Sequence, residues 1–522
     1  MSSSPSSSLA AGADWLARQI ERRKLAFVVL FSVIFLGGCL SIAATKIMWS
    51  DELSTYYPAR LPTTAELLAF FREGLDVHTP TSALLMRASI AAFGDNHTAI
   101  RVPYILGFWL MCLCVFRFVS RRCPPIYGAA AMVFPLITSA FYYACEARPY
   151  ALIMGFTALA LVCWQQILEN QWRALSLFGL WISLAACISL HYYAILIWIP
   201  FGLAELARLW ARKRPDWPVW IAIVGALFPL LLFLPAIQAT RVTFIGSMWS
   251  RPHFSQIENS YRFMLTLALA PMVGVAILWA AISRSVPSKS DTLSAPALPP
   301  LPERILVGSL AALPVFGVPL SLLVGGFVER YVLASMVGIT IFLAFTVCTR
   351  SRGDRLLAAL MVVCFLSWFL LKTSSTVRKQ MVESGGLPMR AARPFQAKTW
   401  MRDIEQSNLP VAATPGVFFQ QLQFYVPASI HPRIYYLTSR ADARRYDGTD
   451  SGDNGALLFA RRVPLQVPSY ESFVASNPHF LLCAEITNPT WHIEKLLDDG
   501  AHLKLLRRQE TYFLFDVTMP HP

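Results

Sequence analysis

The feature that most constrains this chain is a series of apolar segments, each long enough to cross a bilayer, which takes roughly 20 apolar residues per helix. Hydrophobic residues make up 55% of the 522 residues and charged residues only 15%, whereas soluble proteins carry roughly 25% charged residues. This composition excludes a disordered chain, a coiled coil and an ordinary soluble enzyme. We therefore expect an α-helical polytopic membrane protein with about eleven transmembrane helices. The segments are residues 25–44, 99–119, 125–144, 149–168, 173–190, 192–210, 218–238, 261–282, 304–325, 331–349 and 356–373.

Basic residues indicate how these helices are oriented. The clusters of Lys and Arg all fall on one side of the membrane when the N-terminus is placed in the cytoplasm, as the positive-inside rule requires. An odd number of spans then places the C-terminus on the extracytoplasmic side. The formal net charge of +14 is thereby explained, and we expect no nucleic-acid partner. The clusters lie at residues 18–24, 117–122, 208–214, 284–289 and 350–355.

The sequence predicts three parts. Residues 1–24 form a cytoplasmic N-terminal tail, residues 25–375 a transmembrane domain, and residues 376–522 a small extracytoplasmic domain. In the last part, helical patterns alternate with short runs of β-forming residues, which is typical of an α/β layer structure. We expect its charged residues to form a solvated surface. The helical patterns cover residues 397–406 and 489–499, and the β-forming runs cover 433–437, 479–483 and 512–516.

The first outer loop, residues 45–99, is too long to be a simple connection. Thr63 and Glu66 have the spacing of a capping box at the start of a helix, and the apolar residues that follow are spaced for one helical face. A second such pattern runs from Ser82 to Phe93. Both stretches are too short and too charged to span the bilayer. We therefore expect two amphipathic helices that lie in the membrane interface.

Ionisable and aromatic polar residues gather at those ends of the apolar segments that the topology assigns to the outer face. Burying such groups beside a bilayer is costly, so each is a candidate functional residue. Each also has a structural interpretation, because an acid pair can cap a helix, a histidine can end one, and Glu146 and Arg148 can form an ion pair that locks a turn. The candidates are Asp51, Glu52, His78, Glu146, Arg148, Tyr150, His191, Tyr192 and Arg330.

Four motifs that contain most of these candidates follow one another along residues 49–150. The series resembles the GT-C superfamily of polyprenyl-phosphate-sugar-dependent glycosyltransferases, and within it the protein O-mannosyltransferases and the lipid A aminoarabinose transferases. Pro149 is a departure, since family members often have Met or a similar residue there. The motifs are Trp49-Ser-Asp-Glu52, Asp76-Val-His-Thr-Pro80, Phe93-Gly-Asp-Asn-His-Thr-Ala-Ile-Arg-Val-Pro103 and Glu146-Ala-Arg-Pro-Tyr150.

This resemblance implies a GT-C fold in which residues 25–375 form the catalytic domain and the first outer loop forms two juxtamembrane helices over the catalytic cavity. It implies transfer of a hexosyl or pentosyl group from a polyprenyl-phosphate-linked donor to a hydroxyl acceptor on the extracytoplasmic side. In the family, the acid after the first span acts as the catalytic base, which corresponds to Asp51, with Glu52 as the second acid. No motif requires a cofactor. Some relatives bind a divalent metal near the motif of His78, which makes His78 a candidate metal ligand.

The residues support this chemistry on their own. Displacing a lipid phosphate by a hydroxyl group needs a base near the hydroxyl, for which Asp51 is the candidate, and such assistance contributes roughly 10²–10⁴-fold. Arginine binds phosphate through bidentate, charge-assisted bonds, so we assign the donor phosphate to Arg148 first and to Arg330 second. One direct displacement inverts the anomeric carbon. Positioning or substrate-binding roles fall to His78, Glu146, Tyr150, His191 and Tyr192. Tyr193 is a further residue that can hydrogen-bond to the sugar or stack on it.

We expect the partners to be the lipid bilayer, a polyprenyl-phosphate sugar donor, and a glycan, lipid or protein acceptor. The sequence lacks the Rossmann and P-loop motifs of nucleotide-binding proteins. The alternative function is a transporter or flippase of a lipid-linked saccharide, which would also need many spans. We find no two related halves with paired broken helices, which such a transporter is expected to have. The compact loops favour a bacterial inner membrane.

Overall fold

The computed structural model describes residues 5–244, 250–285, 298–383, 395, 398–487 and 490–520. The chain forms two compact units, which we describe separately. Each unit combines segments that are far apart in the sequence. Unit 1 comprises Met1–Ala43, Arg101–Leu232 and Pro252–Thr376, and unit 2 comprises Ala44–Ile100, Phe233–Arg251 and Val377–Pro522.

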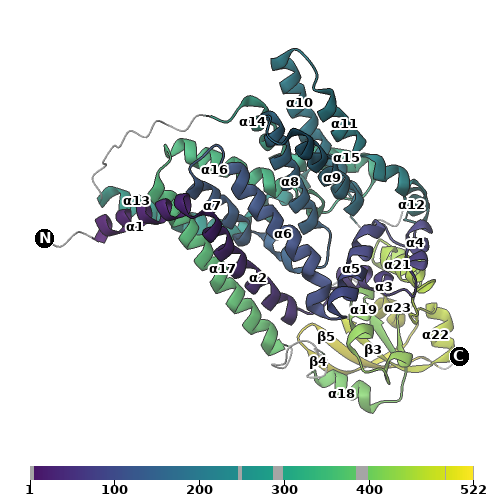
Figure 1. The fold of residues 1–522 in the computed structure, drawn as a ribbon. Coiled ribbons are helices and arrows are strands. Elements are labelled where there is room, and N and C mark those ends of the chain that lie inside the picture. Colours follow the sequence, from purple (N-terminus) through teal and green to yellow (C-terminus); the bar gives the residue numbers. More distant parts are fainter. Residues whose placement is uncertain are drawn as a thin grey trace. The chain divides into compact units, whose positions relative to one another are not determined.

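Unit 1 is built from helices (Figure 1). The chain passes from one unit to the other within four helices, α2, α6, α12 and α17. The helices are α1 (Pro5–Arg22), α2 (Lys24–Thr45), α6 (His97–Val119), α7 (Pro125–Val133), η1 (Phe134–Ile137), η2 (Ser139–Cys145), α8 (Tyr150–Leu168), α9 (Arg173–Leu190), η3 (Tyr192–Ile197), α10 (Trp198–Arg212), α11 (Trp217–Gly225), α12 (Phe228–Phe244), α13 (Ser255–Ser285), α14 (Leu301–Ala311), α15 (Leu313–Val324), η4 (Glu329–Val332), α16 (Ser335–Arg350) and α17 (Arg355–Glu383).

The apolar helices agree with the predicted spans. Within the described ranges, eight helices are long and apolar enough to cross a membrane, or up to ten if each of two bent pairs counts as one span. The pairs bend by 77° between α7–η1 and η2 and by 53° between α14 and α15, and α16 is a shorter apolar helix. Each predicted segment coincides with one of these helices or pairs. The prediction of a polytopic helical membrane protein is confirmed.

In unit 1, α6 and α8 cross so closely that only glycine fits at the contact. A Cβ added to Gly155 would clash with the carbonyl oxygen of Gly107, and one added to Gly107 would lie 2.7 Å from the Cα of Leu152. Small residues at such crossings allow helix backbones to approach each other inside a membrane. The crossing fixes α8, whose first residue is the site candidate Tyr150.

The N-terminal tail is helical over most of its length, because α1 begins at Pro5 and ends at Arg22. Its residues Ala13, Ala17 and Ile20 are buried. Their spacing of three and four residues places them on one face of the helix. α1 packs against α7, so residues 5–22 of the tail are an ordered part of unit 1.

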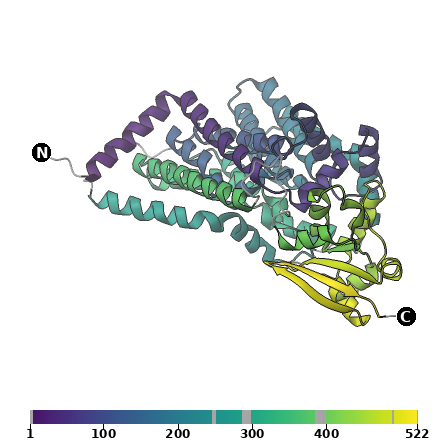
Figure 2. The same ribbon diagram turned by 90° about the horizontal axis from the view of Figure 1, so that it is seen from below.

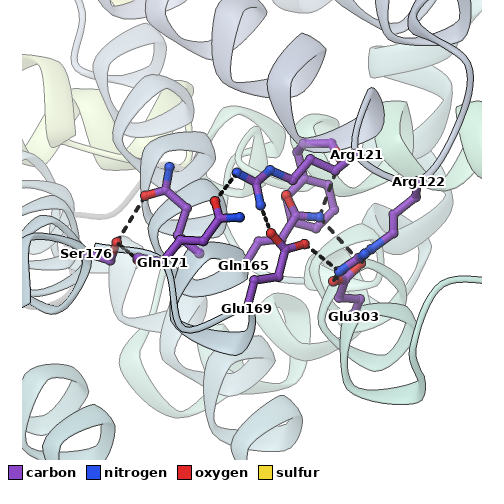
Figure 3. Close-up of polar contacts among 9 residues, drawn as sticks. Arg121, Arg122, Gln165, Glu169, Gln171, Ser176 and Glu303 are labelled. Carbon is purple, nitrogen blue, oxygen red and sulfur yellow. Dashed lines mark hydrogen bonds and ion pairs between the residues drawn. The ribbon is translucent and has the colours of Figure 1, made fainter. Parts of the chain in front are cut away.

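A network of ion pairs connects the residues that follow α6 and α8 with α14 (Figure 3). Arg122 donates to the buried Glu303 (Nε–Oε2, 2.9 Å), and its Nη2 lies 3.0 Å from Oε1 of Glu169. Arg121 also pairs with Glu169 and donates to the side chain of Gln171 (2.6 Å). Arg121 and Arg122 belong to a basic cluster that was predicted to be cytoplasmic. Glu169 and Glu303, from two other segments, thus neutralise these two arginines. Such a satisfied network can hold helices in register.

Unit 2 contains residues 45–99, which form three helices: α3 (Ser50–Ala59), α4 (Thr64–Arg72) and α5 (Pro80–Phe93). The last two are the two predicted helices. Oγ1 of Thr63 accepts a hydrogen bond from the backbone N–H of Glu66 (3.1 Å), as the capping pattern predicts. α3 was not predicted as a separate helix, and it carries Asp51 and Glu52.

Unit 2 also contains a five-stranded sheet of order β2-β1-β3-β5-β4. β1 pairs in parallel with β2 and β3, whereas β5 runs antiparallel to β3 and β4; the long strands β4 and β5 are yellow in Figure 2. The predicted α/β structure is confirmed. The elements are α18 (Thr399–Gln406), β1 (Val411–Thr414), α19 (Gly416–Tyr425), η5 (His431–Arg433), β2 (Ile434–Tyr435), α20 (Arg440–Tyr446), α21 (Ser451–Ala460), α22 (Tyr470–Ser476), β3 (His479–Glu485), α23 (Trp491–Asp498), β4 (His502–Gln509) and β5 (Tyr512–Thr518).

The core of this α/β structure packs α20, α22 and α23 against the sheet. Ala443, Phe473 and Leu496 of these helices form one buried cluster with Leu482 of β3 and Val517 of β5. These five side chains are at most 3% exposed. The three helices therefore cover one face of the sheet. The segments that connect strands and helices lie outside this core.

The expectation that the charges of the C-terminal part form a solvated surface is wrong for three acids. The exposed fractions of Asp450, Asp453 and Glu485 are 0%, 2% and 9%. Arg440 and Arg444 pair with Asp450 (2.7 and 2.8 Å), and Asp453 accepts hydrogen bonds that are described below. The partners of Asp450 and Asp453 lie within residues 436–444. They make this burial possible, because a buried charge is costly chiefly when it is unpaired.

Candidate functional site

The predicted base Asp51 and the second acid Glu52 lie in the first turn of α3. A helix N-terminus favours negative charge because unsatisfied N–H groups and the helix dipole point there. Glu52 is fully buried, and its Oε2 accepts a hydrogen bond from the backbone N–H of Trp49 (3.0 Å). Asp51 is half-buried and lines a cavity together with Ser50 and Ser54. Glu52 thus fixes the start of α3, whereas Asp51 faces a space that a ligand can enter.

Helix α19 holds the residues before α3 in place. The backbone N–H of Met48 donates to Oη of Tyr425 (2.8 Å), and Nε2 of Gln421 donates to the carbonyl oxygen of Met48 (2.8 Å). Tyr425 also shares a hydrogen bond with Nε2 of His97 (2.7 Å). The position of Asp51 therefore depends on a helix that lies more than 300 residues later in the chain, and no local sequence signal reveals this link.

His78 lies in the segment between α4 and α5. Its Nδ1 is 2.5 Å from Oδ1 of Asp76, which also accepts the backbone N–H of His78 (3.0 Å). The carbonyl oxygen of Asp76 accepts a hydrogen bond from Thr240 of α12 (3.2 Å). Asp76 thus orients the imidazole ring, and the His78 side chain is 20% exposed. No group of three or more His, Cys, Asp and Glu side chains suited to a metal ion occurs among the residues that the structure describes.

In unit 1, the turn between η2 and α8 carries Glu146, Arg148 and Tyr150, which are only 2–3% exposed. The backbone N–H of Arg148 donates to the carbonyl oxygen of Glu146 (2.8 Å). Pro149 comes next and is the N-cap of α8. The first N–H groups of a helix have no partner within the helix, so proline costs little at this end. The departure at Pro149 therefore fits the local backbone.

An aromatic cluster adjoins this turn. The ring centroid of Tyr150 lies 5.8 Å from that of His191, and the His191 centroid lies 4.8 Å from that of Tyr331 in η4. Arg148 and Arg330 both act electrostatically on the Tyr331 hydroxyl. Both arginines predicted to bind phosphate are thus close to the same tyrosine.

Three further tyrosines of unit 1 lie in η3 and η4. Tyr192 opens η3, and its hydroxyl is buried. Tyr193, which was also predicted to contact the sugar, follows it, and its Oη donates to the carbonyl oxygen of Gly326 (2.5 Å). The ring centroid of Tyr193 lies 4.7 Å from that of Tyr331. Tyr331 was given no role from the sequence, although it follows Arg330 directly.

The chain was compared with known proteins. No protein-family model and no curated protein matches it. Among solved structures, ArnT from Cupriavidus metallidurans bound to undecaprenyl phosphate matches with a TM-score of 0.55 and 11% identity. The same protein in the apo state matches with a TM-score of 0.58 and 12% identity. Each match covers 94% of this chain and 98% of the ArnT chain.

The chain has the GT-C fold. The fold predicted from the ordered motifs is thereby confirmed over nearly the whole chain, including the C-terminal part that the motifs do not reach. Within the GT-C fold, the predicted site residues form two sets. Unit 2 carries Asp51, Glu52 and His78, and unit 1 carries Glu146, Arg148, Tyr150, His191, Tyr192 and Arg330.

A cavity of about 760 Å³ contains none of these predicted residues. It lies in unit 1 and is lined by Arg122, Arg173, Arg208 and Asp216, among others. Arg173 and Arg208 both pair with Asp216 (2.5 and 3.1 Å). Burial alone would raise the pKa of Asp216, but the bonds from Arg173 and Arg208 outweigh burial and lower the pKa. Because none of the predicted site residues lines this cavity, and Arg173 and Arg208 already have Asp216 as a partner, we do not assign the chemistry to it.

Proposed function

We propose that this chain is a membrane glycosyltransferase that transfers a sugar from a polyprenyl-phosphate-linked donor to a hydroxyl acceptor, with inversion at the anomeric carbon. The transferred group is a hexosyl or pentosyl group. The reaction takes place on the extracytoplasmic side of a bacterial inner membrane, with the N-terminus in the cytoplasm and the C-terminal α/β domain outside. The observation that carries the proposal is the GT-C fold shared with ArnT, whose structure was solved with undecaprenyl phosphate.

Asp51 acts as the general base in this proposal. The acceptor hydroxyl transfers its proton to the Asp51 carboxylate while its oxygen forms a bond to the anomeric carbon. The bond between that carbon and the phosphate oxygen breaks, and the electron pair leaves with polyprenyl phosphate. The half-buried position of Asp51 at the edge of a cavity supports this role, because a base must reach the hydroxyl directly or through one water.

Arg148 and Arg330 bind the donor phosphate. The phosphate gains one negative charge as the bond to the sugar breaks, so a guanidinium group stabilises the transition state more than the ground state. Arg148 is almost completely buried, and a dry environment strengthens its interaction with a phosphate. Tyr150, His191 and Tyr192 bind or position the substrate, and Glu146 orients the turn that carries Arg148.

Glu52 and His78 have supporting roles. Glu52 holds the start of α3 through the Trp49 N–H and thereby positions Asp51. His78 positions the substrate, and it would hold a divalent metal if the enzyme uses one. Asp76 fixes its ring through Nδ1, an arrangement that second-shell carboxylates of metal-binding histidines commonly have.

The test uses the purified full-length chain in lipid nanodiscs with labelled polyprenyl-phosphate sugars and a set of hydroxyl acceptors. We expect acceptor-dependent release of polyprenyl phosphate and a glycosylated product of inverted configuration. A parallel measurement in liposomes follows movement of the intact donor across the bilayer. Movement of the donor without cleavage by any acceptor would overturn the proposal in favour of a transporter.

A further inference from the structure

A cavity of about 550 Å³ in unit 2 lies at the point where the order of the parallel strands reverses. The chain leaves β1 through α19 and adds β2 on one side of β1, and it later adds β3 on the other side. Thr414 at the end of β1, Gly416 at the start of α19 and Thr490 after β3 all line the cavity. In open α/β sheets, ligands bind in this crevice outside the carboxyl ends of the strands. Its volume lies within the roughly 300–1,000 Å³ typical of small-molecule sites.

The charges that line the cavity are all negative. Asp51, Asp447 and Asp453 contribute carboxylates, and no Lys or Arg is among the described residues of its wall. An ionised carboxylate only accepts hydrogen bonds, so these groups suit a ligand rich in hydroxyl donors and repel a phosphate. Tyr436 and Trp491 add aromatic faces to the wall. Aromatic walls with a few convergent polar groups are typical of sites for small organic ligands.

A hydrogen-bonded group of buried side chains fixes one wall. Nε2 of His492 donates to the carbonyl oxygen of Leu437 (2.8 Å), which leaves Nδ1 as the acceptor of the neutral ring. Oγ1 of Thr414 lies 2.9 Å from this Nδ1, and Oγ1 of Thr490 lies 3.1 Å from it. Burial lowers the pKa of His492 to about 4, although the Leu437 carbonyl opposes the shift. The ring is therefore neutral near pH 7 and adds no positive charge to the cavity.

Asp453 is held just as firmly. It accepts hydrogen bonds from the Tyr436 hydroxyl (2.6 Å) and from the backbone N–H of Ser439 (2.8 Å). Burial raises the pKa of Asp453 to about 6, although these hydrogen bonds lower it. Asp447 is less constrained, since it is half-buried and accepts the backbone N–H of Trp491 (3.2 Å). Besides Asp51, Asp447 is thus the carboxylate of the wall that a ligand can most easily engage.

We infer that this cavity binds the acceptor as an uncharged, hydroxyl-rich saccharide and presents one of its hydroxyl groups to Asp51. The inference rests on the proposed function for the role of Asp51, but it adds the location of the acceptor and its chemical class. The acceptor presents sugar hydroxyl groups to the cavity and no phosphate. The α/β domain builds most of the cavity, because all of its walls except the start of α3 come from residues 414–492.

The experiment measures binding without any donor. Saturation-transfer NMR on the full-length protein in nanodiscs compares the methyl glycosides of mannose, glucose and galactose with their 6-phosphates. We expect at least one neutral glycoside to bind and its phosphate to bind at least tenfold more weakly. Equal or tighter binding of the phosphates, or no binding of any neutral glycoside, would overturn the inference.

Two variants place the binding in this cavity. Asp447→Asn keeps an oxygen that accepts the Trp491 N–H but removes a charged acceptor for the ligand, and we expect roughly tenfold weaker glycoside binding. Asp498→Asn is the matched control, because Asp498 is 53% exposed and does not line the cavity. Gly455→Leu extends a side chain from the cavity wall into open space, since nothing lies within 4 Å of its Cβ. It should abolish binding, whereas Gly274→Leu, equally uncrowded but outside the cavity, should not.

The outcomes separate this inference from the proposed function. If neutral glycosides bind and Gly455→Leu abolishes their binding, but no donor releases polyprenyl phosphate, the saccharide site stands and the transferase proposal fails. If polyprenyl phosphate is released with an acceptor while Gly455→Leu leaves both binding and transfer unchanged, the transferase proposal stands and the assignment of the acceptor to this cavity is wrong.

Discussion

The two units of this protein differ in the charge of their candidate residues. In unit 1, the residues near Tyr331 include the two arginines Arg148 and Arg330 and the aromatic side chains Tyr150 and His191, and the acid Glu146 lies in the same turn as Arg148. In unit 2, the cavity that contains Asp51 is lined by carboxylates, with no Lys or Arg in its described wall. Glycosyl transfer from a lipid phosphate needs one cationic group for the leaving phosphate and one anionic group for the acceptor proton. We infer that unit 1 serves the donor and that unit 2 serves the acceptor.

A second comparison concerns acids alone. Glu169 and Glu303 of unit 1 are paired with Arg121 and Arg122 (Figure 3), so their charges are neutralised within the fold. Asp453 of unit 2 has hydroxyl and N–H partners instead of a cation. Charge neutralised by an arginine is typical of a structural element, whereas a carboxylate without a cationic partner in a cavity wall is typical of a binding or catalytic site.

The largest expected effect is that of Asp51→Asn. The amide has a similar shape but cannot accept a proton, so acceptor-dependent release of polyprenyl phosphate should fall by roughly 10²–10⁴-fold. Asp95→Asn is the control, because Asp95 belongs to the same loop and is an exposed residue that accepts a hydrogen bond from Tyr56. Initial rates with saturating donor provide the measurement. Full activity of Asp51→Asn would refute the assignment of Asp51 as the general base.

The next effect tests the donor side. Arg148→Ala should lower the rate by roughly 10²–10³-fold, comparable to the loss of one transition-state hydrogen-bond donor. Arg148→Lys keeps the charge but not the planar fork that matches a phosphate, so its loss should be smaller and should appear partly as a higher KM for the donor. Arg117→Lys, an exposed change at the end of α6, should leave both parameters unchanged. If Arg148→Lys is fully active with an unchanged KM, bidentate binding of the phosphate by Arg148 is refuted.

A third prediction uses the buried histidine of the cavity wall in unit 2. Burial lowers the pKa of His492 to about 4, whereas an unfolded histidine has a pKa of about 6.5. The unfolded state therefore binds the proton more tightly, and this group removes stability as the pH falls from about 6.5 to 4, by about 3 kcal/mol in total. His492→Gln retains an N–H for the Leu437 carbonyl and should abolish this loss.

Asp453 of the same wall has the opposite effect on how stability depends on pH. Burial raises the pKa of Asp453 to about 6, so protonation favours the folded state and its contribution to stability is lost as the pH rises through about 6. Relative to wild type, His492→Gln should gain stability on acidification from pH 6.5 to 4, and Asp453→Asn should lose stability. Melting temperatures of the full-length protein across this pH range provide the measurement. Parallel curves for all three proteins would contradict the assigned burial.

The smallest effect concerns Glu52. Glu52→Gln keeps an oxygen that can accept the Trp49 N–H, so we expect activity to change only by a few-fold. Glu52→Ala removes this capping bond, which typically costs about 1 kcal/mol, and it should lower both the melting temperature and the rate. The comparison of the two variants distinguishes positioning from proton transfer. A loss in Glu52→Gln as large as that in Asp51→Asn would make Glu52 a direct participant in the chemistry.

The sequence predicts those parts of the fold that depend on local patterns. The spans follow from apolar length, α4 follows from the Thr63–Glu66 spacing, and β3 and β5 follow from runs of β-forming residues. β1 and β4 were not predicted. β1 has only four residues, and β4 has the charged sequence His-Leu-Lys-Leu-Leu-Arg-Arg-Gln with mostly exposed side chains. Local signals of this kind are weak because strand formation depends on the neighbouring strands.

The candidate site was predictable only in part. Asp51 and Arg148 stood out because ionisable residues beside apolar spans are uncommon. The cavity next to Asp51 was not predicted, because Thr414, Asp453 and His492 come together only through the strand order of the sheet. Asp453 in particular was expected in solvent. Its burial depends on Tyr436 and Ser439, whose hydrogen bonds no spacing in the sequence indicates.

We propose that unit 1 binds the donor phosphate and that unit 2 supplies the base and the acceptor site. The most direct measurement is photo-crosslinking of the inactive Asp51→Asn protein in nanodiscs with polyprenyl phosphate that carries a diazirine on the isoprene unit next to the phosphate. We predict labelled peptides from unit 1 that contain Arg148 or Arg330, and loss of the label in the Arg148→Ala background. Labelling confined to residues 414–492, or labelling unaffected by Arg148→Ala, would contradict the account.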